Sequence, residues 1–194
     1  MPRVSKAEAE KNRAIIEQVS ARLFREQGFH GISVADLMSA AGLTHGGFYG
    51  HFESKDALAA IACERAFEES VERWRKRVDA APDRAAALES LLDGYLSTRS
   101  RNAVGAGCPI AALATDVSRE PDDKPVHEAF VAGLTAQLAV LESVQPGDDP
   151  AARRVEALAQ MSLLVGAMVL ARATRGSALS TEVLAAARAH LHLA

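Results

Sequence analysis

Residues 33–58 read SVADLMSAAGLTHGGFYGHFESKDAL, and this stretch decides the fold. Ser33, with an aspartate three residues later, has the spacing of a capping box, which predicts a short helix that ends at Gly42. Thr44 can cap a second short helix running to about Phe52, after which a longer helix begins. Two short helices joined by a glycine turn predict a helix-turn-helix, a motif that lays its second helix in a groove of DNA.

The rest of the chain is also helical in pattern, because apolar residues recur at helical spacing and no stretch shows sustained two-residue alternation. We expect an all-α protein of about nine helices. A three-helix DNA-binding module (residues 8–68) is fused through a long fourth helix to a helical effector-binding and dimerisation body (residues 69–194). Glycine and proline residues, which tend to end helices, predict the remaining helices near residues 5–27, 54–80, 83–101, 109–119, 124–144, 151–174 and 180–192.

The charge distribution excludes a general polyanion binder, since the formal net charge is −3. Residues 1–55 hold seven Lys or Arg against six Asp or Glu, whereas the remainder holds fifteen against nineteen. The N-terminal part is therefore mildly basic, which suits the part of the chain expected to face a phosphate backbone.

The second short helix has two different sides. Phe48 and Phe52 are four residues apart and are expected to anchor it to the module. Gly46, Gly47 and Gly50 fall on the opposite side, although each glycine costs about 1 kcal/mol in a helix relative to alanine. Close approach of the backbone to another surface, such as a groove wall, explains this cost. The alternative is that these glycines merely form a loop.

Several side chains around this helix suit DNA. Hydroxyls, N–H groups at helix amino ends and basic side chains can bind phosphates, and residues at the amino end of the helix can reach base edges. The candidate DNA-binding residues are Ser33, Thr44, His45, Gly46, Gly47, Tyr49, His51 and Lys55.

The segments GLTHGGFYGHFESKDAL and FREQGFHGISVADLMSAAG resemble the TetR family signature over about residues 10–60. The resemblance implies an all-α homodimeric repressor that binds a palindromic operator and releases it when the body binds a small molecule. His45 and Gly47 stand where many members have Lys and Thr, and Gly50 stands where many have a larger residue. We therefore expect DNA reading to depend on His45, Thr44, backbone fit and DNA shape.

Residues 158–171 are apolar almost all round, as expected of a helix buried on two sides. Together with the last helix they are predicted to form a four-helix homodimer interface, which the resemblance also implies. The alternative is a central core helix in a monomer.

The candidate effector residues are Trp74, Tyr95, Cys108, His127, Phe130, Met161 and Met168, a set that predicts a small apolar or reactive effector. Cys108 opens a helix in AGCPIAALATDVSRE, where the helix end favours the reactive thiolate. This segment also resembles TetR members that sense electrophiles or oxidants. Each residue has the alternative of being plain core, and Cys63 is predicted to be core.

The chain shows no catalytic constellation, clustered metal ligands or phosphate-binding loop, so we expect no enzyme activity, metal or cofactor. The apolar stretch 157–173 is expected to fall short of a membrane span, and the N-terminus has no signal-peptide core, which favours the cytoplasm. A protein-interaction adaptor and a transcriptional activator remain as alternatives.

Overall fold

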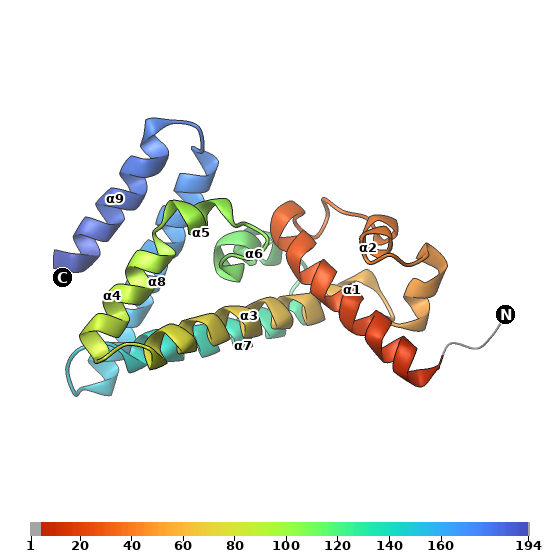
Figure 1. Ribbon diagram of the computed structural model, residues 1–194, viewed down its shortest axis with the longest axis horizontal. Coiled ribbons are helices and arrows are strands. Elements are labelled where there is room, and N and C mark those ends of the chain that lie inside the picture. Colours follow the sequence, from red (N-terminus) through yellow and green to blue (C-terminus); the bar gives the residue numbers. More distant parts are fainter. Residues whose placement is uncertain (1–4, 194) are drawn as a thin grey trace.

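The computed structural model describes residues 5–193, and all regular structure within them is helical (Figure 1). The predicted all-α class is confirmed, with nine α-helices and one 3-10 helix in the described part of the chain. The elements are α1 (Lys6–Gln27), α2 (Val34–Ala40), η1 (His45–Gly50), α3 (Lys55–Asp79), α4 (Arg84–Tyr95), α5 (Thr98–Asn102), α6 (Pro109–Val117), α7 (Pro125–Ser143), α8 (Pro150–Ala173) and α9 (Ala178–Leu193).

Local signals set the boundaries of the N-terminal module. The predicted capping box of α2 is confirmed, because the Ser33 hydroxyl accepts from the Asp36 N–H and the Asp36 carboxylate accepts from the Ser33 N–H. Gly42 follows with φ +73, a left-handed conformation that glycine adopts without strain. Ser54 caps α3 as predicted, by accepting from the N–H of Ala57.

The second short helix differs from the prediction. It is a 3-10 helix of six residues that begins after Thr44, and the Thr44 side chain makes no capping hydrogen bond. The predicted Thr44 cap was therefore wrong. Three glycines in six residues have too little helix propensity to sustain an α-helix, and 3-10 geometry is common in such short pieces.

The expected single helix over 83–101 is two helices, α4 and α5, with a break at Leu96 and Ser97. The Ser97 hydroxyl caps α5 by accepting from the N–H of Ser100, and it donates to the carbonyl of Gly94 at 2.9 Å. A serine that satisfies both helix ends with one side chain favours a turn over a continuous helix.

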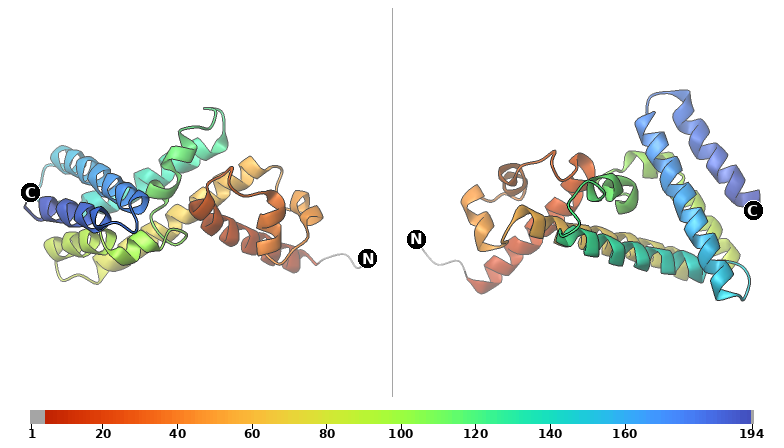
Figure 2. Two further views of the ribbon diagram at one scale, coloured as in Figure 1. Left: turned by 90° about the horizontal axis from the view of Figure 1, so that it is seen from above. Right: turned by 180° about the vertical axis from the view of Figure 1, so that it is seen from behind.

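Helix α3 belongs to both halves of the molecule. Its amino end packs on α1 and the rest of its length runs beside α7, an arrangement visible in Figure 1 and from above and behind in Figure 2. Phe67 of α3 meets Phe130 of α7 edge to face at 5.3 Å, and Gly133 lies directly over the Phe67 ring. Rigid packing along α3 therefore connects the N-terminal module to the body.

Helices α8 and α9 form an antiparallel pair at the far end of the body (Figure 2). Contrary to the sequence-based expectation, α8 is long and apolar enough to cross a membrane, with a mean hydropathy of 1.5 over 18 residues. One side of α8 packs into the body, whereas Val155, Leu158, Val169 and Leu170 remain exposed. An apolar outer face of this kind marks a surface for association.

Replacing Gly133 by alanine should destabilise the protein by about 1–3 kcal/mol, because the added methyl would lie 2.2 Å from the Phe67 ring. Urea unfolding of the Gly133→Ala protein measures this loss. In a Phe67→Leu background the same substitution should cost less, since the smaller side chain relieves the overlap. An equal cost in both backgrounds would show that the ring is not what excludes the methyl.

Candidate DNA-binding and effector sites

The short helix η1 is anchored from below by aromatic packing. Phe48 and Phe52 are 0% and 4% exposed, and their ring centroids lie 5.7 Å apart. The guanidinium of Arg13 on α1 lies 4.5 Å from the Phe52 ring centroid and donates to the carbonyl of His51. This cation–π contact and hydrogen bond hold η1 at a fixed angle to α1.

The opposite side of η1 faces outward. Thr44, His45, Gly46 and Gly47 are exposed, and the Tyr49 side chain is 68% exposed with its ring edge against Phe48. The geometry thus brings five of the predicted DNA-binding residues to one free surface at the end of the molecule distant from α9 (Figure 1).

Nothing within the described chain requires glycine on this surface. A Cβ atom at Gly46 or Gly50 would meet no atom within 4 Å, and one at Gly47 would make only ordinary contact with Met38. None of the three glycines has a positive φ. Neither internal packing nor backbone conformation in the described residues requires these glycines, so close approach of an external surface to the backbone stays the prediction for them.

Three predicted contacts are already partly used inside the protein. Both the N–H and the hydroxyl of Ser33 donate to the Asp36 carboxylate, and the hydrogen bond from the Ser33 side chain holds the pKa of Asp36 below its usual range. The Lys55 ammonium donates to the carbonyl of Ile32 at 2.6 Å, and burial lowers its pKa. His51 is half-buried. These residues orient the module in the structure as described, and their contacts to DNA stay a prediction.

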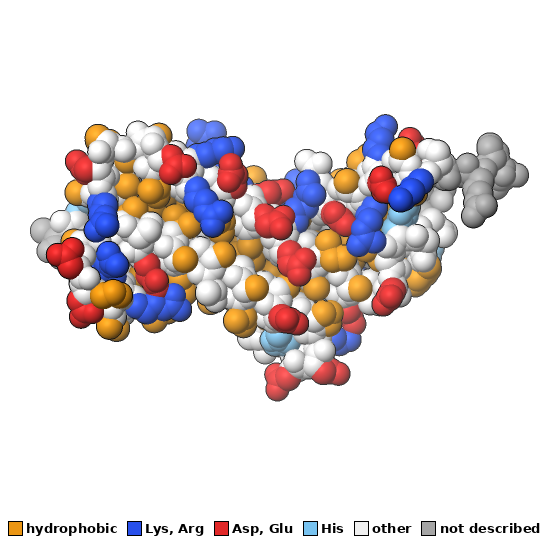
Figure 3. All heavy atoms as spheres, turned by 90° about the horizontal axis from the view of Figure 1, so that it is seen from below, with side chains coloured by type: hydrophobic (Ala, Val, Ile, Leu, Met, Phe, Trp, Pro, Cys, Tyr) orange, Lys and Arg blue, Asp and Glu red, His pale blue; other side chains and the backbone are white. Residues whose placement is uncertain are grey.

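Surface charge does not mark a broad nucleic-acid-binding region on the face shown in Figure 3. Acidic, basic and apolar side chains alternate there along the whole length of the molecule. This face therefore offers no extended positive field for DNA, and the prediction stays with the local geometry of η1.

In the body, a cavity of about 370 Å³ brings together four of the seven effector candidates, Trp74, Tyr95, Cys108 and Met168. The rings of Trp74 and Tyr95 meet edge to face at 6.2 Å. Cys108 is half-buried at the amino end of α6. The volume lies within the range of about 300–1,000 Å³ that small-molecule sites occupy.

The other effector candidates lie elsewhere. His127 is hydrogen-bonded through its ring to the carbonyl of Glu120, Phe130 packs on Phe67, and Met161 is 4% exposed in the core. None of the three lines the cavity. Cys63 is fully buried as predicted, and burial raises the pKa of its thiol to about 12, which keeps it unreactive.

Four arginines that the sequence reading missed also line the cavity, namely Arg73, Arg77, Arg99 and Arg172. The expected apolar site is therefore strongly basic. Arg73 and Arg77 are one helical turn apart, which was a detectable signal, but Arg99 and Arg172 join them only through the tertiary fold.

Two sets of contacts connect this region to the DNA-binding module. Arg25 of α1 is buried and donates to Gly107, the residue before Cys108, and to Glu69 of α3. Farther along, Glu120 pairs with His30 at 2.6 Å.

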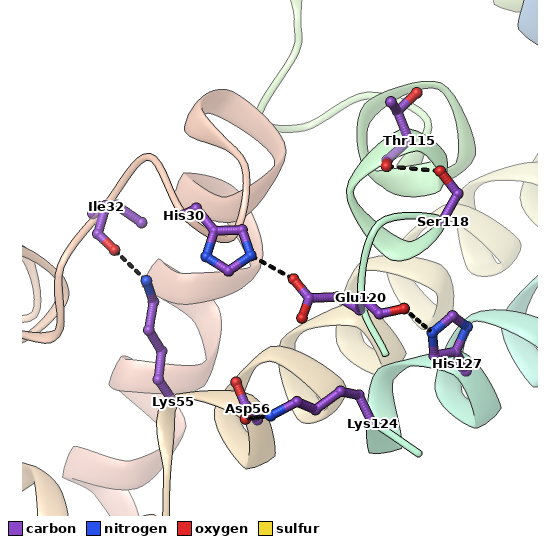
Figure 4. Close-up of polar contacts among 9 residues, drawn as sticks. All are labelled: His30, Ile32, Lys55, Asp56, Thr115, Ser118, Glu120, Lys124 and His127. Atoms are coloured by element: carbon purple, nitrogen blue, oxygen red, sulfur yellow. Dashed lines mark hydrogen bonds and ion pairs between the residues drawn. The ribbon is translucent and has the colours of Figure 1, made fainter. Parts of the chain in front are cut away.

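Figure 4 shows this second set, in which His30 of the module points at Glu120 beyond the end of α6. Beside it, Asp56 at the start of α3 pairs with Lys124. The segment from Cys108 to Lys124 therefore lines the cavity at one end and contacts the DNA-binding module at the other.

A helix-turn-helix with an exposed second helix, attached to a helical body, is the layout of a DNA-binding transcriptional regulator. The family model described as bacterial regulatory proteins, tetR family, matches residues 16–61. An HTH-type transcriptional regulator of Mycobacterium tuberculosis is 29% identical over 165 residues, covering 80% of this chain and 81% of the relative.

The HTH-type transcriptional repressor KstR2 of Rhodococcus jostii is 30% identical over 98 residues, which covers 50% of this chain and 46% of the relative. The crystal structure of reduced NemR from Escherichia coli superimposes with a TM-score of 0.77 at 21% identity, covering 94% of this chain and 97% of that one. Residues 16–61 thus match the TetR family, and the chain is similar to DNA-binding transcriptional regulators of that family over most of its length.

Replacing Gly46 by alanine should stabilise the free protein by about 0.4–1 kcal/mol and weaken its binding to duplex DNA, since the methyl has room in the protein but not against a groove wall. Thermal unfolding and fluorescence anisotropy measure the two effects. Gly42→Ala is the matched control, because its φ of +73 makes that substitution destabilising. Unchanged DNA affinity in Gly46→Ala would refute the close-approach explanation.

Proposed function

We propose that this regulator is a homodimeric repressor that leaves a palindromic operator when an effector occupies the cavity lined by Trp74, Tyr95 and Cys108. The observation that carries the proposal is the outward surface of η1, which presents exposed residues and unconstrained glycines on a rigidly anchored helix. The relative KstR2 is named a transcriptional repressor, which supports repression over activation. A protein that binds operators in this way is proposed to act in the cytoplasm.

Dimerisation is proposed through α8 and α9. The exposed apolar side chains Val155, Leu158, Val169, Leu170 and Leu179 lie on these two helices. Gly166, on α8, has no neighbour within 4 Å of its Cβ position, which leaves room for close helix approach. A two-fold dimer built on this face carries two copies of η1, as two half-sites of a palindrome require.

Release follows from a change in the distance between the two copies of η1 in the dimer, which no longer match two half-sites of the operator. An effector in the cavity contacts α3 through Trp74 and the start of α6 through Cys108. Movement of either helix changes the position of α1 through Arg25, Glu69 and Gly107. The effector must bind more tightly to the released state than to the DNA-bound state for this shift to occur.

An activator uses the same module and is distinguished by transcription from the operator with and without the protein. A protein-interaction adaptor is distinguished by salt. The regulator should lose affinity for duplex DNA steeply as salt increases, because phosphate contacts release counterions. Salt-independent binding to DNA would favour the adaptor.

Tyr49→Phe should weaken binding by roughly fivefold on all operator variants alike, because the exposed hydroxyl is proposed to contact phosphate. His45→Ala should instead reduce the preference among operator variants, since His45 begins η1. Both are measured by anisotropy on the DNA beside the coding region and on its single-base variants. A base-selective loss in Tyr49→Phe, or an unchanged preference in His45→Ala, contradicts these roles.

Cys108→Ser should retain DNA binding and lose release by quinones or aldehydes, if the sensor is this half-buried thiol at the cavity wall. Cys63→Ser is the control, since its buried thiol is protonated and should not take part. Gel-shift titration of both proteins with a quinone measures release. If the Cys108→Ser protein still releases DNA when the quinone is added, Cys108 is not the sensor. Release would then depend on noncovalent binding of an effector.

A further inference from the structure

The polar lining of the cavity is dominated by guanidinium groups from three separate helices. Arg73 and Arg77 come from α3, Arg99 from α5 and Arg172 from α8. None of the residues that line this cavity in the described chain is acidic. The fold thus converges four cations on one site with no anion among its walls.

These cations are not neutralised by the protein. Arg73 donates to the Gly107 carbonyl at 3.5 Å and Arg77 to the Ser90 carbonyl at 3.2 Å. Arg172 donates to the carbonyls of Ser100 and Arg101, both at 3.3 Å. Within residues 5–193 none of the four lining arginines makes a salt bridge. Carbonyl oxygens orient a guanidinium but leave its charge available to a ligand.

The carboxylate whose charge acts on Arg73 is already engaged. Glu69 pairs with Arg25 at 3.0 Å and with Arg65 at 3.7 Å. It is not among the residues that line the cavity. Glu69 therefore does not neutralise the positive charge of the lining arginines.

Glycines leave room for two of the guanidiniums. A Cβ at Gly94 would lie 2.4 Å from Nη1 of Arg77, and one at Gly107 would lie 2.7 Å from Nη2 of Arg172. The backbone therefore leaves space that these side chains occupy. Each guanidinium is also oriented by its hydrogen bonds to backbone carbonyls, which lowers the entropy that it loses when it binds a ligand.

Unused hydrogen-bond donors point to an acceptor in the same site. The Tyr95 side chain is 6% exposed, and its hydroxyl meets only the Cys108 thiol, a weak hydrogen-bond partner, among the described residues; Nη1 of Arg172 is unpaired. Burial raises the pKa of Tyr95 well above its usual value, so the phenol keeps its proton and can donate it. Trp74, Leu91 and Met168 supply an apolar wall beside these donors.

We propose that the effector is an organic carboxylate whose charged group is bound by the arginines and Tyr95, and whose apolar part packs against Trp74. The proposal rests on the cavity being the effector site, as proposed above, and adds the chemical class of the ligand. Guanidinium groups recognise carboxylates through paired hydrogen bonds, and a neutral isostere would leave them unpaired.

Trp74 gives a direct test, because it is the single tryptophan of the chain and lines the cavity. The full-length protein is titrated with three matched pairs of probes: benzoate and benzamide, 3-phenylpropanoate and 3-phenylpropanamide, octanoate and octanamide. Inorganic phosphate serves as a bare oxyanion. At least one carboxylate should quench or shift Trp74 emission with an affinity about tenfold higher than that of its amide.

Arg77→Gln and Arg172→Gln should each weaken carboxylate binding about tenfold and leave amide binding unchanged. Arg77→Gln keeps the test valid if Arg172→Gln fails to fold, since Arg77 is exposed and lines the cavity. Arg75→Gln is the matched control on the same helix, because Arg75 does not line this cavity. Its carboxylate affinity should equal that of the unmodified protein.

The proposal is overturned if no carboxylate binds below about 10 mM, if the amides bind equally well, or if the preference survives both substitutions. If phosphate binds as tightly as the best carboxylate, the claim that an apolar part of the ligand packs against Trp74 is overturned. Operator binding is measured on the same proteins. A protein that binds DNA but no carboxylate refutes the proposed ligand class alone. A protein that does not bind DNA refutes the proposed function, and the Trp74 titration then still shows whether the cavity binds carboxylates.

Discussion

The buried guanidinium of Arg25 is the contact on which the relation between the two halves of the molecule depends. Its side chain is 2% exposed, and a charge so placed costs several kcal/mol unless it is paired. Arg25 donates to the Ala21 carbonyl at 2.9 Å, to Glu69 at 3.0 Å and to the Gly107 carbonyl at 3.4 Å. These acceptors belong to α1, to α3 and to the segment before α6, so one side chain ties the DNA-binding module to both walls of the cavity.

This arrangement gives the regulator two mechanical connections. The first is the continuous helix α3, which packs on α1 at its amino end and lines the cavity farther along. The second is the segment from Cys108 to Lys124, whose far end contacts His30 and Asp56. A ligand that displaces Gly107 or Cys108 therefore acts on α1 directly, in addition to any tilt of α3.

The N-terminal module was largely predictable because its signals are local. The capping box at Ser33, the turn glycine at Gly42 and the cap at Ser54 each act over three or four residues, and all three are present. The failures there are also local: Thr44 makes no cap, and the glycine content converts an expected α-helix into a 3-10 helix. The DNA contact assigned to Lys55 could not take account of the Ile32 carbonyl, which accepts from its ammonium in the folded protein.

The amino-acid sequence by itself determined the all-α class, the helix-turn-helix and the bare outer side of η1, since periodicity, caps and glycine placement are properties of neighbouring residues. Tertiary structure alone decided which distant side chains share the cavity. It brought Trp74, Tyr95 and Cys108 together, separated His127, Phe130 and Met161 from them, and added arginines at positions 73, 77, 99 and 172. Such a site cannot be read from spacing, because its charge and shape arise where α3, α5 and α8 meet.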